Sequence, residues 1–425
     1  MTNSSLLSGV KSSPVRSFRW RSLASGLGIL SLPPTRSIRW RSLASGLALS
    51  LVAAGCGCSS SSESSDPVAV AEAASAAFAG GDYAGALERS QACLALTPDN
   101  VDVLILQGRA ALATGDFALA GEAAAKAAAL HPGDVAVLQL TAQAAFQNHD
   151  FESATKAYTR LAFDESLPPE IRALGYVGRG IVGLARVGTG SAPEDCRDVS
   201  RLDFLRALAL DPRNKPARYH LGHLYRNAFH FKQAALEQFS AYVALMKQTA
   251  DPHVAKAQAE VDSLTREIET EKARRPGADK RKPEACAEAM RKADAARQKK
   301  QLKTAANLYG EALRHDPLSF EAADRLAQCT LELDGRTRAG QERAYALYCQ
   351  AASLRTYVKT MIAAGDLAMK LGKWASAATH YSRAMAAKPT DLTAIDGLIR
   401  ALQKCGNRKS AAIYQRYRDA IPVRK

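Results

Sequence analysis

Three glycines in the middle of the chain have the spacing of a nucleotide-binding loop. Residues 178–183 spell GxGxxG, and Asp198 and Asp203 follow at about the distance of a ribose-binding carboxylate. This chemistry requires a β-strand directly before the loop, whereas the preceding residues start at Pro169 and favour a helix. We therefore expect the glycines to permit close helix packing, and we predict no cofactor.

Histidines offer a second kind of chemistry, metal binding. His220 and His223 are three residues apart, so both imidazoles would meet a metal ion on one helix face, and His230 lies nearby. No carboxylate or cysteine constellation accompanies them, and the sequence has neither an HExxH motif nor paired CxxC motifs. We therefore predict ordinary surface or groove histidines and no metal.

The eight cysteines lack the spacing of a disulfide framework. Cys329 and Cys349 fall on the two helices of one predicted repeat, so a bridge between them is one interpretation. The favoured alternative is that the scattered cysteines are small apolar fillers between alanine-rich helices. Since no nucleophile–base pair or phosphate loop accompanies them, we predict that the protein is not an enzyme.

Basic residues are concentrated in two segments. The formal net charge is +15, and residues 1–55 carry seven Lys or Arg and no acidic residue, while residues 272–303 carry twelve against four. The second segment has no interleaved aromatic residue, which argues against a nucleic-acid site that stacks bases. It predicts either a solvated helix face or contact with an anionic partner, through a basic patch at Lys280, Arg281, Lys282, Lys299 and Lys300.

The N-terminal segment has the order of a secretory signal. Residues 36–41 are basic, residues 42–54 are apolar but too few to span a bilayer, and small residues precede Cys56. The segment resembles a bacterial lipoprotein signal, although Ala53 stands where that family usually has Leu. The resemblance implies cleavage before Cys56, a lipid on that cysteine, and a Ser-rich tether over 56–66.

Residues 1–55 contain this signal segment in two near copies, Arg16–Leu32 and Arg36–Leu51. We expect residues 1–55 to be removed or disordered, with an uncleaved N-terminal anchor as the alternative. A working signal places the chain in the cell envelope, lipid-anchored to a bacterial membrane on its periplasmic or exported face.

The elements that must position these groups are helices. Alanine dominates the apolar residues, aromatic residues make up only 6% of the chain, and few stretches alternate as strands do. The sequence therefore predicts an all-α fold of thin, closely packed helices.

An aspartate followed by an aromatic residue recurs every 34 residues. The pairs are Asp82-Tyr83, Asp116-Phe117 and Asp150-Phe151, and an alanine follows each aromatic residue after three positions, at Ala86, Ala120 and Ala154. The Gly or His before each Asp would end one helix, and the Asp would cap the next. The alanine would let the two helices approach closely.

This pattern resembles the tetratricopeptide repeat, a 34-residue helix–turn–helix unit that stacks into a right-handed superhelical solenoid. We count seven or eight clear units, plus a divergent one at 169–212. The resemblance implies two arrays, at 67–248 and 284–425, joined by a helical connector and basic linker at 249–283.

The connector carries an apolar heptad seam from Val254 to Ile268. We expect this seam to pack against the solenoid, because three turns are marginal for an independent coiled coil. A short coiled-coil dimer is the alternative.

In this repeat family the first helix of each unit lines the groove that holds a partner. Carried over, those positions give a polar groove of mixed charge: Arg109, Gln139, Gln143, Tyr219, His223, Arg226, Asn227, Asp324, Gln328, Lys359, Asp366, Arg400 and Lys404. The clamp by which some members hold a C-terminal carboxylate has no match, because the first unit offers Ala71 and Ser75.

These expectations together describe a membrane-anchored, non-catalytic scaffold of the bacterial cell envelope that binds other proteins through its groove. One alternative is a non-catalytic subunit, or an unrecognised enzyme, of an envelope assembly or transport complex. Another is a cytoplasmic adaptor, if the signal is not functional.

Overall fold

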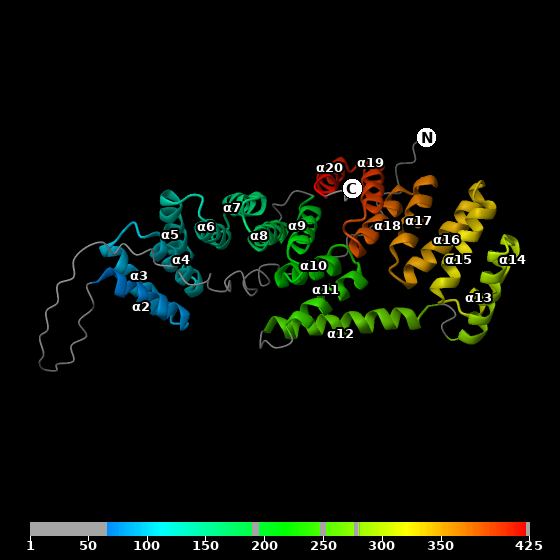
Figure 1. Cartoon of the computed structure of the whole chain (residues 1–425), viewed down its shortest axis with the longest axis horizontal. Coiled ribbons are helices and arrows are strands. Elements are labelled where there is room, and N and C mark those ends of the chain that lie inside the picture. Colours follow the sequence, from blue (N-terminus) through cyan, green and yellow to red (C-terminus); the bar gives the residue numbers. More distant parts are fainter. Residues whose placement is uncertain (1–65, 189–194, 247–251, 276–278, 280, 422–425) are drawn as a thin grey trace, which may run out of the picture. The chain divides into compact units, whose positions relative to one another are not determined.

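The computed structural model describes residues 66–188, 195–246, 252–275, 279 and 281–421. Within these ranges the chain forms nineteen helices, α2 to α20, and no strand (Figure 1). The predicted all-α class is therefore confirmed for this part of the chain. Cys56 and its Ser-rich tether lie outside the described residues, as do both copies of the signal segment.

The chain divides into two compact units, residues 1–189 (unit 1) and 190–425 (unit 2). The described part of unit 1 consists of helices that pack consecutively. They are α2 (Pro67–Ala79), α3 (Tyr83–Leu96), α4 (Val101–Thr114), α5 (Phe117–Leu130), α6 (Val135–Gln147), α7 (Phe151–Phe163) and α8 (Pro169–Gly188).

The turns between paired helices of unit 1 are built as the repeat predicts. Carboxylates of Asp82, Asp116 and Asp150 accept hydrogen bonds from backbone N–H groups three residues on, at 2.9, 3.1 and 3.0 Å. Gly81 and Gly115 precede the first two with φ of 83° and 85°, a left-handed conformation that ends the preceding helix and that glycine adopts without strain. The predicted capping role is confirmed.

Small residues set the distance between the helices of unit 1. Ala86, Ala120 and Ala154 have no exposed surface. Gly178 lies within the continuous helix α8, where a Cβ atom would overlap the ring of Tyr158 on α7. The GxGxxG segment therefore serves helix packing, as expected, and the strand that a dinucleotide loop requires does not precede it in the described chain.

Unit 2 contains the remaining helices, again packed largely in chain order. They are α9 (Cys196–Leu210), α10 (Lys215–Asn227), α11 (Lys232–Leu245), α12 (Pro252–Ala273), α13 (Pro283–Gln298), α14 (Leu302–His315), α15 (Phe320–Asp334), α16 (Arg338–Leu354), α17 (Val358–Lys370), α18 (Trp374–Ala387), α19 (Leu392–Lys404) and α20 (Arg408–Asp419).

The long helix α12 belongs to unit 2 and packs against α11. Ala257 and Leu264 of its apolar seam have no exposed surface, so the expectation that the seam packs on the solenoid is confirmed. The boundary between the compact units falls at 189–190, before the predicted connector at 249–283.

That boundary also falls within one of the predicted repeats. Helix α8 packs on α7 in unit 1, whereas α9 packs on α10 and α20 in unit 2. The unit boundary at 189–190 therefore falls within the divergent repeat predicted at 169–212.

The first and last helices of unit 2 pack against each other (Figure 1). Arg201 of α9 is fully buried and donates from Nη1 to Ser382 Oγ at 2.6 Å and from Nη2 to the Ser382 carbonyl at 2.8 Å. Asp198 accepts from Ser410 Oγ at 2.8 Å and from Tyr414 Oη at 2.5 Å. These residues, Asp198, Arg201, Ser382, Ser410 and Tyr414, form the Arg201 cluster.

Aromatic rings and opposite charge stabilise the buried guanidinium of Arg201. It lies over the rings of Phe229 at 4.9 Å and Tyr225 at 5.5 Å, both within cation–π range. Burial alone would lower the pKa of Arg201, but Tyr414, Tyr225 and Asp198 together raise it above its ordinary value. Arg201 therefore keeps its charge inside the fold.

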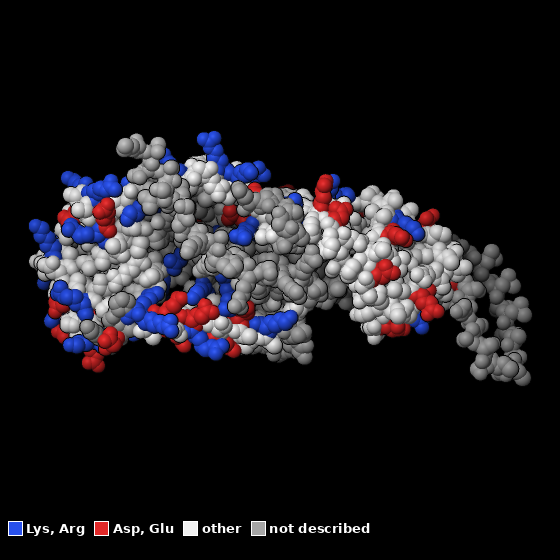
Figure 2. Space-filling view, turned by 180° about the vertical axis from the view of Figure 1, so that it is seen from behind, with Lys and Arg blue, Asp and Glu red and all other residues white. Residues whose placement is uncertain are grey.

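The two units differ in charge. Residues 66–188 carry eight Lys or Arg against fourteen Asp or Glu, whereas residues 189–425 carry 42 against 27. In the face seen in Figure 2, blue side chains are accordingly numerous on unit 2. The basicity of the chain beyond residue 65 thus belongs to unit 2.

Candidate functional site

The first helices of the C-terminal repeats, α13, α15 and α17, are joined by a polar network. Asp324 is 9% exposed and accepts from Thr360 Oγ1 at 2.6 Å and from Gln328 Nε2 at 2.8 Å. The amide oxygen of Gln328 in turn accepts from Arg297 Nη1 at 2.9 Å. Two predicted groove residues, Asp324 and Gln328, therefore hold neighbouring repeats together.

A second polar contact recurs across the helix pairs. Tyr309 donates to Asp294 and Tyr381 donates to Asp366, each at 2.6 Å and each between residues 15 apart. Burial and the neighbouring carboxylate raise the pKa of Tyr309 and of Tyr381. The sequence carried the signal for this contact, because an Asp stands 15 residues before the Tyr in both repeats, but only Asp366 was predicted.

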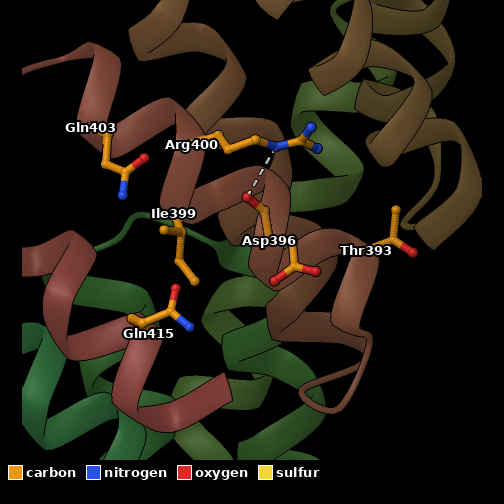
Figure 3. Close-up of a pocket in the computed structure, with 6 residues that line it drawn as sticks. All are labelled: Thr393, Asp396, Ile399, Arg400, Gln403 and Gln415. Atoms are coloured by element: carbon orange, nitrogen blue, oxygen red, sulfur yellow. Dashed lines mark hydrogen bonds between the residues drawn. The ribbon is translucent and has the colours of Figure 1, made fainter. Parts of the chain in front are cut away.

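An open polar hollow of about 470 Å³ lies at α19 and α20. Figure 3 shows Thr393, Asp396, Ile399, Arg400 and Gln403 of α19 around it, with Gln415 of α20. Four of these α19 residues, 393, 396, 400 and 403, follow helical spacing and so share one face. Asp396 is also ion-paired with Arg418 of α20, at 3.0 Å between Oδ1 and Nε.

Four predicted groove residues on α17 and α19 are exposed: Lys359, Asp366, Arg400 and Lys404. Arg400 lines the hollow and donates from Nε to the Asp396 carbonyl at 3.3 Å. Lys404 lies over the Trp374 ring, with Nζ 5.8 Å from its centroid. These four predicted groove positions are therefore accessible to a partner.

The predicted groove positions on α10 are covered by other parts of the chain. Tyr219 and His223 are only 1% and 3% exposed, because aromatic rings and α12 cover them. Arg226 is ion-paired with Glu260 and Glu267 of α12, and neighbouring Asn227 is half-buried. This face of α10 is therefore occupied by the chain itself.

The predicted groove residues of unit 1 are also less open than expected. Gln139 and Gln143 of α6 are 4% and 8% exposed. Arg109 of α4 is half-buried, and burial lowers its pKa while the charge of Asp134 partly opposes that shift. The two glutamines pack inside the repeat stack.

The predicted basic patch does not form one free surface. Arg281 binds Asp316 through Nε and Nη2, both at 2.8 Å, and this contact lowers the pKa of Asp316. Arg297 pairs with Glu332 at 2.8 Å. Lys282, Lys299 and Lys300 are exposed, whereas Lys280 lies outside the described residues.

The cysteines of the described chain are free thiols, so the open alternative of a Cys329–Cys349 bridge is wrong. Cys329 has no exposed surface, and burial raises its pKa. Cys349 Sγ lies 3.6 Å from His380 Nε2. Cys329 thus acts as an apolar filler, as favoured from the sequence.

Of the three histidines expected at the surface or groove, His220 and His223 are buried and His230 is exposed. His220 and His223 are 2% and 3% exposed, and burial is the main cause that lowers the pKa of each to about 3. Among the described residues, no group of three or more His, Cys, Asp or Glu is arranged to hold a metal ion.

Within the described ranges, no helix has the length and apolarity needed to cross a membrane.

The comparisons with known proteins identify the repeat. Residues 72–135 match the tetratricopeptide repeat, and no curated protein matches the chain. A crystal structure of MamA protein is 18% identical over 44% of this chain and 94% of that chain, with a TM-score of 0.34. The Cut9–Hcn1 hetero-tetramer of the APC/C is 14% identical over 84% and 79%, with a TM-score of 0.33.

The family match over α2 to α5 and the helix pairs of both units define the class of the protein. The chain contains tetratricopeptide repeats and has their all-helical solenoid fold. Such stacks offer extended surfaces for binding other proteins, and this is the function that the fold supports.

Proposed function

We propose that the protein is a non-catalytic scaffold that binds a partner protein along the open first-helix face of the C-terminal repeats. The observation that carries this proposal is the exposure of Lys359 and Asp366 on α17 and of Arg400, which lines the polar hollow at α19 and α20. The network of buried Asp324 and half-buried Gln328 gives this face a fixed geometry, so little ordering is required when a partner binds.

The partner is a polar segment of mixed charge. Arg400 and Lys359 supply positive charge, Asp366 supplies negative charge, and Gln403 and Gln415 supply amides for hydrogen bonds. A photocrosslinking amino acid at Lys359 or Arg400 tests the proposal: adducts with a partner protein at these positions would support it, and no adduct at either position in folded protein would contradict it.

We further propose that the scaffold is tethered to a bacterial membrane by lipid on Cys56, within the cell envelope. Support comes from the order of basic, apolar and small residues before Cys56 and from the serines after it. A lipid on this cysteine would leave the helical repeats free to face the aqueous compartment.

Labelling of bacterial cells with radioactive palmitate tests this tether. We expect label on the wild-type chain, a shift to the precursor in the presence of globomycin, and no label on Cys56→Ser. Cys93→Ser, at a cysteine buried inside unit 1, is the matched control and should remain labelled. Soluble, unlabelled wild-type protein in these cells would contradict the tether.

A further inference from the structure

The turns inside the four C-terminal repeats all carry exposed basic side chains. The α13–α14 turn carries Lys299, Lys300 and Lys303, and the α15–α16 turn carries Arg336 and Arg338. The next two turns carry Lys370 and Lys373, then Lys404, Arg408 and Lys409. All ten side chains are exposed, and we call them the basic rim.

These turns lie along one edge of the array, because successive first helices run parallel. Arg297 near the end of α13 contacts Gln328 and Glu332 near the end of α15. Lys373 lies over the Tyr345 ring at 4.6 Å, and Lys404 lies over the Trp374 ring, so neighbouring turns are side by side. The charges therefore form a row.

Carboxylates of the chain neutralise little of the positive charge of the basic rim. Of its members, only Arg338 has an ion pair among the described residues, with Glu342 at 3.2 Å. The two acidic residues at these turns, Glu332 and Asp334, are paired with Arg297 and Arg343.

The opposite edge of the same array, formed by the connections between successive repeats, has more of its basic residues in ion pairs. Its turns contain basic residues as well, but the structure pairs several of them with carboxylates. Arg281 pairs with Asp316, Arg355 with Glu321 at 3.3 Å, and Lys388 with Asp391 at 3.1 Å. Lys282 and Arg314 on this edge are exposed and have no ion pair among the described residues, so the rim edge carries the larger number of such basic side chains, and not all of them.

The repeat itself does not require this charge. In unit 1 the equivalent turns carry Asp82, Asp116 and Asp150 and no Lys or Arg. Moreover, Lys300 has φ of 60°, at a turn where Gly372 and Gly406 adopt the same left-handed conformation in later repeats. A lysine is held there in a conformation that favours glycine.

We infer that the basic rim binds the anionic headgroups of a phospholipid membrane. A row of cationic turn tips on one edge can meet a flat anionic surface together, and each contributes to adsorption. A site that stacks nucleic-acid bases needs open rings, whereas the Tyr345 and Trp374 rings beside the rim are half-buried and each has a lysine ammonium over it.

A membrane is preferred over an acidic protein because the tether proposed at Cys56 would hold the chain at one, and in this choice the inference rests on the proposed function. Lipid anchoring by one attachment becomes stable when a polybasic surface adds a second. The basic rim would therefore orient the scaffold with this edge toward the bilayer.

Vesicle co-sedimentation of the full chain carrying Cys56→Ser tests the rim without the lipid. Vesicles contain phosphatidylcholine alone or with about 30% phosphatidylglycerol. We expect binding only to the anionic vesicles, with loss of binding when NaCl is raised to about 0.5 M. Absence of binding to anionic vesicles at low salt would overturn the inference.

Two variants with equal charge change separate the rim from net charge. The rim variant carries Lys303→Gln, Arg336→Gln, Lys370→Gln and Lys409→Gln, and the control carries Lys282→Gln, Arg314→Gln, Arg355→Gln and Lys388→Gln on the opposite edge. We expect binding on the order of 100-fold weaker for the rim variant, and within about threefold of the parent for the control. Equal losses would contradict a localised rim.

Two further probes decide between partner classes. Tighter binding of poly-glutamate or of a single-stranded oligonucleotide than of anionic vesicles, lost in the rim variant, would overturn the choice of a membrane. Vesicle binding by the rim together with absent palmitate labelling in cells would refute the tether and leave the rim's lipid affinity standing.

Discussion

Replacing Arg201 with alanine should lower the free energy of unfolding of unit 2 by about 3–5 kcal/mol. The substitution removes a fully buried cation and leaves the Ser382 carbonyl without its charged donor, while Asp198 loses the neighbouring positive charge. It also empties the space over the Phe229 and Tyr225 rings. Loss of a buried partner costs much more than loss of a surface charge.

Urea unfolding and hydrogen exchange measure this effect. We expect exchange to accelerate together in α9 (196–210) and in α20 (408–419), because the Arg201 cluster joins them. Arg213→Ala, at an exposed arginine in the α9–α10 turn, should change stability by less than about 0.5 kcal/mol. Faster exchange in α9 with unchanged exchange in α20 would show that the contact does not stabilise both ends of unit 2.

The same contact predicts which fragments fold. The C-terminal repeats, 284–425, should be less stable when expressed alone than within residues 190–425, since Ser382, Ser410 and Tyr414 then lose their partners on α9. A C-terminal array that begins at 284, as expected from the sequence, lacks α9 and therefore lacks the Arg201 cluster.

Acidification should destabilise unit 2 well before its carboxylates titrate. The pKa of His220 and of His223 is lowered to about 3 by burial, with smaller effects of His253 on His220, and of His220 and Arg226 on His223. In the unfolded chain each imidazole has a pKa near 6.5. Between these values the unfolded state binds protons that the folded state excludes, so the free energy of unfolding falls as pH falls.

The expected loss is on the order of 2 kcal/mol for each of the two histidines between pH 6.5 and 5, and stability is fully retained above pH 6.5. Urea unfolding at several pH values measures it. The double variant His220→Gln, His223→Gln should have a clearly flatter dependence over this range, although its stability at pH 7 is lower. His131→Gln, at an exposed histidine of unit 1, should keep the wild-type slope. An unchanged slope in the double variant would contradict the assignment to these rings.

Local features of the fold were predictable from the sequence because they depend on neighbouring residues. The caps at Asp82, Asp116 and Asp150 involve donors three residues away, and the buried alanines lie within the same helix pair. The apolar seam of α12 could be placed for the same reason. The spacing of residue types along the sequence is enough to predict these caps, the buried alanines and the apolar seam.

Long-range contacts were not predictable in this way. Arg201 meets Ser382 and Tyr414 across separations of 181 and 213 residues, and nothing near Arg201 in the sequence indicates them. Similarly, Tyr219 and His223 occupy groove positions of their repeat, but α12 and the neighbouring rings cover them. The position of a residue within its own repeat does not predict whether a helix later in the chain will bury it.

The basic rim was only partly predictable from the sequence. The sequence indicated positive charge at 272–303, but ion pairs with Asp316 and Glu332 remove part of it from the surface. Lys299 and Lys300 belong with Arg336, Lys370 and Lys409, which follow at roughly repeat-length intervals. Aligning the turns of successive repeats would have revealed this row.

The central claim is that the first-helix face of the C-terminal repeats binds a partner protein, and site-specific photocrosslinking in intact cells tests it most directly. A photoreactive amino acid is placed at Lys359 or Arg400 on first helices, or at Glu342 or Thr379 on second helices, all of which are exposed. We predict discrete protein adducts of one mass increment at positions 359 and 400 and none at 342 and 379. Adducts of equal yield at all four positions, or at none of them in folded protein, would contradict the account.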